Sequence, residues 1–461
     1  RGTVTNEGNA FVGAAYGNDV ANGAKLALGT GVTTTGFSSV ANVTSVQNAA
    51  GAVEAAASGG SVVNTSIEDN LANSSVSTST NQIQALAYGN RASGNTLSVT
   101  GNSLSTASTA GVRQGAVSNV GQLITDASFS VQNVQTGSGS VTATQRDTTT
   151  NPASPLAAQV RTDIGGSVTG STVASNGNTS SAAATSNSAT NGLTLAGTTI
   201  ATSGALQNSQ GTSADVNALI GLAGIPGSPG TPAAPFNFNA TGSGLIGNVA
   251  DSQVTLTGGT LTVATLGLTT AQINYLTANG WTITGGNISG PATLLGTIPL
   301  SSFVAINSGG TAPFSATIPG TPATAAVANQ GGVTVAVAGA VTNSQLSVNG
   351  NTANGAVTGN TATNSVSVTG GNIAAGNGAT VATAGTLPLG SGTGAQADHA
   401  LSNVQQVNEG ASLTTSVFGT YAIDTTAGAA ISGSTLSVSN NSQRGSAVAN
   451  TAANSVALSG N

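Results

Sequence analysis

A short motif that the chain repeats after twenty residues restricts its fold more than any other feature. In residues 346–351, Leu346 and Val348 alternate with small polar residues before a Gly-Asn turn, and Val366 and Val368 repeat the alternation. Alternation with a period of two indicates a half-buried β-strand, and a turn that contains Gly can adopt positive φ. The motif therefore predicts short strands joined by tight turns.

The twenty-residue echo occurs elsewhere, and its occurrences are themselves regularly spaced. The second strand of each pair lies near residues 97, 193, 281, 366 and 456. Periods of this kind indicate a repeat architecture, and they predict rungs of about 20 residues nested in modules of about 90.

Two architectures fit this pattern. An all-β, elongated and mostly parallel β-solenoid would stack roughly 23 rungs at ~4.8 Å each into a rod on the order of 110 Å. The alternative is a string of tandem β-sandwich modules. The parallel echo and an aromatic content of only 3% favour the solenoid, whereas the longer period favours the sandwich.

Composition and turn-forming residues divide the chain into four expected segments. They are N-terminal repeat modules at 1–105, a module with a charged, Pro-containing loop at 106–200, a decorated Pro/Phe-rich module at 201–330, and C-terminal repeat modules at 331–461. A short helix is predicted near 269–279, where Thr269 caps the start and Asn279 with Gly280 ends it.

Charge and cysteine content exclude several classes of protein. Only 4% of the residues are charged, the net charge is −6, and cysteine is absent. A basic footprint for nucleic acid is therefore missing, as are thiol chemistry and a hydrophobic run long enough to span a membrane. A start at Arg1 rather than Met fits a processed export product, so we expect a secreted bacterial protein at the cell surface or outside the cell.

Residues that could carry chemistry are few and scattered. His399 is the single histidine and stands beside Asp398, while Glu68 and Asp69 form the densest acidic pair. A catalytic triad needs three converging groups, and Ca²⁺ needs six to eight oxygens. We therefore predict no enzyme activity, no cofactor and no metal site.

Amide side chains recur on the expected strands. Gln47 and Asn48 follow a valine, as do Gln132 and Asn133. Such amides can form ladders along stacked rungs, and the alternative is that they are ordinary exposed side chains.

The decorated module holds the single tryptophan and half of the phenylalanines. A contact surface for a ligand could be formed by Phe236, Phe238, Tyr275 and Trp281. The alternative is a local apolar core beneath long loops.

The Ala-Tyr-Gly-Asn motif at 15–18 returns at 87–90, and turns rich in Asn and Gly recur throughout. In this phrasing the chain resembles secreted, repetitive, β-rich fibre and adhesin proteins of bacterial surfaces, most of all holdfast-anchor proteins and more loosely curli-type fibre subunits. The resemblance implies export, surface attachment and polymerisation, and it brings no catalytic residues.

From these features we expect a structural subunit of an extracellular bacterial filament or surface matrix, such as that of a biofilm. The repeat pattern continues to Asn461 without a polar cap, so copies would assemble head-to-tail through β-stacking. The alternative is a monomeric cell-surface adhesin or glycan-binding protein whose partner is a surface polysaccharide.

Overall fold

The computed structural model describes residues 2–27, 40–57, 63–105, 110–113, 122–145, 160–221, 234–318, 331–376, 378–384 and 392–460. The chain forms two compact units. Unit 1 comprises Arg1–Gly224 and Ala328–Asn461, and unit 2 comprises Ile225–Val327. The four segments expected from the sequence follow chain order, and their boundaries stay a prediction.

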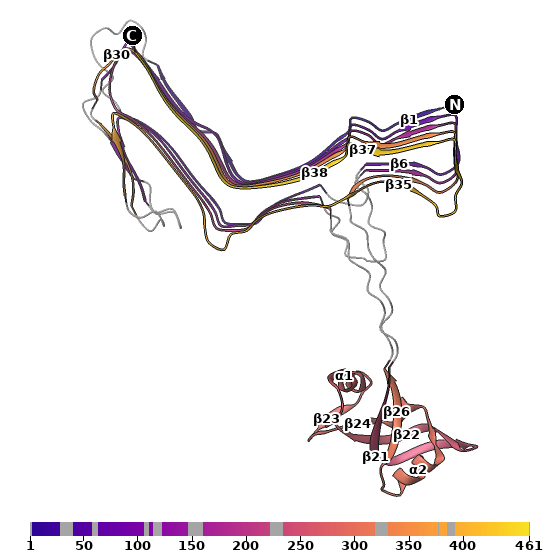
Figure 1. The fold of residues 1–461 in the computed structure, drawn as a ribbon. Coiled ribbons are helices and arrows are strands. Elements are labelled where there is room, and N and C mark those ends of the chain that lie inside the picture. Colours follow the sequence, from indigo (N-terminus) through magenta and orange to yellow (C-terminus); the bar gives the residue numbers. More distant parts are fainter. Residues whose placement is uncertain are drawn as a thin grey trace. The chain divides into compact units, whose positions relative to one another are not determined.

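Unit 1 is an all-β, mostly parallel solenoid, which confirms the predicted fold class. Strands from successive turns lie side by side and in register, so the ribbons run as stacked parallel lines (Figure 1). We call one full turn a rung, the strands that begin each rung its leading side, and the strands that complete it its return side. The leading sheets hold strands from five rungs and the return sheets strands from four.

The leading side consists of β1 (Thr3–Thr5), β2 (Ala10–Val20) and β3 (Gly23–Ala27) in rung 1; β8 (Ser75–Ser77), β9 (Gln82–Thr100) and β10 (Ser103–Ser105) in rung 2; β17 (Thr172–Ala174) and β18 (Thr179–Ala201) in rung 3; β29 (Gln345–Asn349) and β30 (Thr352–Ile373) in rung 4; and β37 (Thr435–Ser439) and β38 (Ser442–Gly460) in rung 5. These strands pair in the order of the rungs.

The return side consists of β4 (Ala41–Ala49), β5 (Val53–Ala56), β6 (Val63–Ile67) and β7 (Leu71–Ala72) in rung 1; β13 (Phe129–Gly137), β14 (Val141–Gln145), β15 (Val160–Ile164) and β16 (Val168–Thr169) in rung 2; β19 (Gly204–Thr212), β20 (Val216–Ile220), β27 (Gly332–Val337) and β28 (Val341–Thr342) in rung 3; and β33 (His399–Val407), β34 (Leu413–Val417), β35 (Thr420–Thr425) and β36 (Ile431–Ser432) in rung 4. A separate antiparallel sheet joins rungs 2 and 4 through β11 (Ala110–Arg113), β12 (Gln122–Ala127), β31 (Ala379–Ala384) and β32 (Gly392–Ala397).

The predicted rung length of about 20 residues is wrong, because the longer period is the rung. Equivalent asparagines of successive rungs lie 72, 97, 173 and 90 residues apart. Leu346 pairs with Leu436 of the next rung, and Val366 pairs with Val456. Within unit 1, the twenty-residue echo therefore links two strands of the same rung, which alternate alike because both have one buried face. The occurrence near residue 281 belongs to unit 2 instead, where the strands are antiparallel. Five leading strands at ~4.8 Å rise about 24 Å, not 110 Å.

The interior of unit 1 is filled by alternate residues from the two sides. Leu97 and Val99 of β9 pack against Phe129 and Val131 of β13, and all four side chains are buried. A second cluster, mostly of Val and Ala, continues the core toward β15 and β27. Small side chains dominate because the two layers lie close together.

A column of residues in the left-handed region forms one corner of the solenoid. Gly8, Thr80, Gly177, Gly350 and Asn440 have φ values of 68°, 55°, 64°, 66° and 56° in successive rungs. The positive φ predicted for the turn after Val348 is thus confirmed. The Gly-Gly pair that follows the second copy of the motif instead lies within β30, because this strand runs on to Ile373.

Unit 2 interrupts rung 3 and has its own antiparallel sheet. Its elements are β21 (Ala234–Ala250), β22 (Gln253–Ala264), α1 (Thr270–Ala278), β23 (Thr282–Thr284), β24 (Asn287–Pro291), the 3₁₀ helix η1 (Ala292–Leu295), β25 (Thr297–Pro299), α2 (Leu300–Asn307) and β26 (Ala312–Ile318). The strand order is β23-β24-β22-β21-β26, with β25 beside β22.

The helix predicted near 269–279 is confirmed as α1. Thr269 and Gln272 form a reciprocal capping box, and Asn279 is the C-cap. The second helix, α2, was not predicted because it falls in a stretch rich in proline. Pro299 at its N-cap position was the available signal, since a helix can begin directly after proline.

Candidate functional site

Columns of asparagine run through the interior of unit 1 from rung to rung. In one column, Asn18 donates its amide N–H to Asn90, Asn90 to Asn187, Asn187 to Asn360, and Asn360 to Asn450, with N···O distances of 2.7–2.8 Å. Every bond points the same way: Nδ2 of one rung donates to Oδ1 of the next. The predicted amide ladders are therefore present, and they have a direction.

Two further asparagine columns share this direction. Their members are Asn9, Asn81, Asn178, Asn351 and Asn441 at one corner, and Asn95, Asn191, Asn364 and Asn454 along the long leading strands. The corner column also receives backbone N–H groups, for example that of Asn178 onto Asn351 Oδ1 at 2.8 Å. These amides thus satisfy polar groups that the thin interior would otherwise leave unpaired.

A glutamine column on the return side fastens the two sides together. Side-chain hydrogen bonds with N···O distances of 2.6–2.7 Å, each from Nε2 to Oε1, join Gln47, Gln135, Gln210 and Gln405. Each glutamine also donates to a backbone carbonyl of the leading side, as Gln135 does to Ser188 at 2.9 Å. The column therefore holds both neighbouring rungs and the facing sheet.

The register of these columns differs from the match seen in the sequence. Gln47 stacks on Gln135 and Gln132 stacks on Thr44, so the Val-Gln-Asn motifs at 46–48 and 131–133 lie three residues out of register with one another. A motif of three residues can recur along one strand, so only the pairing of whole strands decides which copy is stacked.

The Ala-Tyr-Gly-Asn motif, in contrast, is stacked as the sequence aligns it. The rings of Tyr16 and Tyr88 lie 5.4 Å apart and are nearly parallel. The guanidinium of Arg91 lies 5.5 and 5.7 Å from the two ring centroids and 3.7 Å from the carboxylate of Asp19. This cluster joins rung 1 to rung 2 on the outer face.

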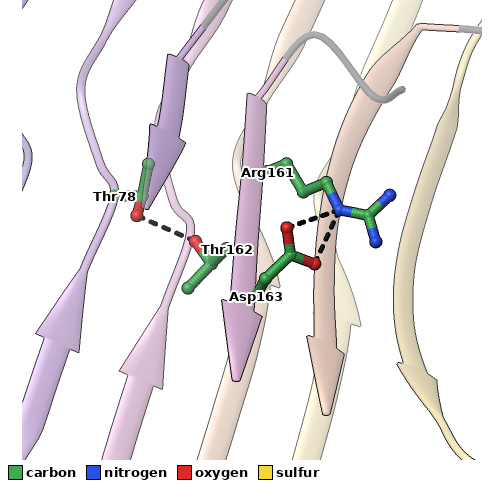
Figure 2. A network of polar contacts seen from close by, with 4 residues as sticks. All are labelled: Thr78, Arg161, Thr162 and Asp163. Carbon is green, nitrogen blue, oxygen red and sulfur yellow. Dashed lines mark hydrogen bonds and ion pairs between the residues drawn. The ribbon is translucent and has the colours of Figure 1, made fainter. Parts of the chain in front are cut away.

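Hydroxyl groups replace amides where β15 meets the corner. Thr162 donates to Thr78 at 2.8 Å (Figure 2). Thr78 in turn donates to Thr65 at 2.7 Å inside the core. On the same strand, Arg161 forms an ion pair with Asp163 on the opposite side of the ribbon (Figure 2). That pair lines an open hollow of about 550 Å³, which is a surface depression rather than an enclosed pocket.

The first and last rungs present open sheet edges. Val456 and Leu458 of β38 are 48% and 55% exposed, whereas their partners Val366 and Val368 in rung 4 are 1% and 0% exposed. At the other edge, the inward-facing Phe11 of β2 is 46% exposed. Both edges therefore carry core-type residues that a further rung would cover.

His399 begins β33 and lies inside the stack. It pairs in register with Gly204, which in turn pairs with Phe129. Neither imidazole nitrogen has a hydrogen-bond partner among the described residues. Burial lowers the pKa of His399, and the charge of Asp398 opposes this shift. The described geometry gives this histidine no hydrogen-bonded nucleophile or orienting group.

Of the aromatic residues singled out in unit 2, Phe238 and Trp281 lie in its core. Trp281 and Phe238 are 2% and 7% exposed, and their rings meet edge to face at 6.4 Å. Tyr275 packs partly buried against the same cluster, and Phe236 is described only as part of β21. Phe238 and Trp281 therefore offer little surface to a ligand. Buried neighbours such as Phe314, 6.1 Å from Phe238, were missed because they belong to a distant strand.

In the ranges that the structure describes, three or more His, Cys, Asp or Glu side chains nowhere gather in a metal-binding arrangement. Among the described helices, neither α1 nor α2 has the length and hydrophobicity to cross a membrane. Comparisons of the chain with known protein families, curated proteins and solved structures found no match.

Proposed function

We propose that this protein is a structural subunit of an extracellular bacterial filament or surface matrix that grows by stacking of rungs. The observation that carries the proposal is the directed asparagine column from Asn18 to Asn450. Its two ends have complementary hydrogen-bonding groups. A column of this kind gains one bond with every rung that is added, just as in cross-β stacking.

The use of polar side chains inside the solenoid supports a structural role. Amides that could bind a ligand are engaged with one another and with the backbone, as in the glutamine column around Gln135 and Gln210. With 4% charged residues, neighbouring copies would repel one another little. The resemblance of the Asn- and Gly-rich motifs to those of surface fibre proteins favours an extracellular location.

A second candidate function is that of an adhesin, and the inserted unit 2 favours it. This unit has its own hydrophobic core, and between Ile225 and Val327 the sequence has a single charged residue, Asp251. A neutral module carried on a rigid solenoid would suit binding to an uncharged surface polysaccharide.

Electron microscopy of the purified chain over a concentration series tests the first proposal. We expect filaments above a threshold concentration, with an axial repeat of about 24 Å, because each copy has five leading strands at ~4.8 Å. Single particles at every concentration would contradict the filament proposal. In that case, retention of the monomer on immobilised neutral polysaccharide would support the adhesin.

A further inference from the structure

We propose that β37 and β38 of one copy pair in parallel with β1 and β2 of the next copy. This inference rests on the proposed function and adds the interface to it. In each of the four successive parallel pairings of the long leading strands, an asparagine of one rung lies beside the equivalent asparagine of the next, and the last pairing places Asn360 beside Asn450. A fifth parallel pairing in the same register, formed between two copies, would place Asn450 beside Asn18 of the next copy.

Hydrogen-bonding groups at the two edges are complementary. Among the described residues, Nδ2 of Asn450 and of Asn454 has no acceptor, whereas Oδ1 of each accepts from the rung below. At the opposite edge, Asn18 donates upward to Asn90, and its Oδ1 has no donor within the described part of the chain. Donors at one edge therefore face acceptors at the other, which specifies head-to-tail rather than head-to-head contact.

The backbone and the apolar residues agree with the same pairing. β38 and β2 are edge strands of 19 and 11 residues, and each has an unpaired row of N–H and C=O groups on its outer side. In the proposed register, Asn440 of one copy stacks on Gly8 of the next. Both have left-handed φ, like the corner residues that stack between successive rungs within the chain. In the same register, the inward-facing Leu458 would lie beside Leu26 of the next copy, which continues the apolar column of Val99, Leu195 and Val368.

The contact between copies is predicted to be weaker than the contact between rungs. The leading sheets have five strands and the return sheets four, so stacking on the leading side leaves a slot one strand wide on the return side. Val456 would therefore stay partly exposed at the junction. Filaments should consequently dissociate under conditions that leave the monomer folded.

Chemical crosslinking tests the register, because the chain has no native cysteine. Ala14, Leu86, Ala183, Ala356 and Ser446 form one outward-facing column, in which Ser446 is the last member and Ala14 the first. In filaments grown from a mixture of the single variants Ala14→Cys and Ser446→Cys, a short bismaleimide should give covalent dimers.

A mismatched pair is the control. Ser455 belongs to a column that ends at Gly23, nine residues and about 30 Å along the strand from Ala14. A mixture of Ala14→Cys and Ser455→Cys should therefore give no dimer. The double variant Ala183→Cys/Ala356→Cys is the positive control, since these residues pair within one chain.

The outcomes separate this interface from the proposed function. Dimers from the matched pair alone support the interface. Filaments that give no matched dimer, or that crosslink both mixtures equally, overturn the register while the filament proposal stands. If filaments form at no concentration, and the wild-type chain gives only single particles, both proposals are overturned.

Discussion

An asparagine side chain ends in one donor group and one acceptor group on a short stem, which suits it to a column with a rise of ~4.8 Å per rung. Asn187 shows what this means inside the solenoid. It is fully buried, accepts from Asn90, and donates to Asn360 and to the carbonyl of Gly211. A buried amide that loses such partners costs free energy, so each column depends on its inner members.

Replacing an inner member of the column should therefore destabilise unit 1. We expect Asn187→Ala to lower the free energy of unfolding by about 3 kcal/mol, because it removes bonds to buried groups on two sides. Asn450→Ala, at the exposed end of the same column, is the matched control and should cost less than about 1 kcal/mol. Denaturant titrations followed by far-UV circular dichroism measure both, and equal losses would contradict the role of burial.

The partly buried imidazole of His399, whose two nitrogens have no hydrogen-bond partner among the described residues, predicts a pH dependence of stability. Burial lowers its pKa from the ordinary value of 6.5 in the folded state, although Asp398 opposes the shift. As the pH falls below 6.5, His399 of the unfolded chain binds a proton while His399 of the folded chain stays neutral to lower pH. The free energy of unfolding therefore decreases on acidification.

The variant His399→Phe should remove this part of the pH dependence, since Phe129 occupies the equivalent position two rungs below. Thermal melts between pH 7.5 and pH 5, at about 0.5-unit steps, compare the two proteins. An identical slope in both would show that other groups cause the acid sensitivity.

At the scale of elements, unit 2 contains a tightly packed contact between a strand and a single side chain. Gly290 of β24 lies directly against Trp281, and a Cβ built on this glycine would come within 2.1 Å of the indole ring. The ring can rest on β24 only because residue 290 has no side chain. Trp281 is also the single tryptophan of the chain, so its fluorescence reports on unit 2 alone.

Adding a methyl group at this position should displace the ring. We expect Gly290→Ala to destabilise unit 2 by about 3 kcal/mol through overpacking and to expose Trp281 to water. Gly258→Ala is the control, because its Cβ would meet only Ile246, at 3.5 Å. A red-shifted emission in the first variant and an unchanged one in the second are the expected results. Unchanged emission in both would contradict the packing argument.

At the scale of the whole molecule, unit 2 is an insertion whose removal should leave the solenoid closed. The last described residue of unit 1 before the insertion is Gly221 and the first after it is Gly331, and a Cβ on Gly331 would lie 3.2 Å from the Cα of Gly221. Inside unit 2, the first and last strands also pair, Ala234 with Ile318. Both units thus have neighbouring ends, as tolerated domain insertions do.

Deleting 225–327 and joining the flanks with a few glycines should therefore give a folded solenoid. The far-UV spectrum should keep its β-sheet signal, and filaments should form as in the full chain if rung stacking drives assembly. The excised unit should fold separately, with Trp281 buried. Aggregation of the deleted chain in place of cooperative unfolding would show that unit 2 is needed to close rung 3.

Local pattern was enough to predict the β class, the positive φ at Gly350, the capped helix α1 and the amide ladders, because each depends on residues a few positions apart. The size of the rung, the partner of Gln47 and the burial of Trp281 were decided by the tertiary structure. Strands of one rung and strands of neighbouring rungs have the same alternation of apolar and polar residues. The sequence therefore determined which face of each strand is buried, and only the pairing of whole strands determined which strands stack.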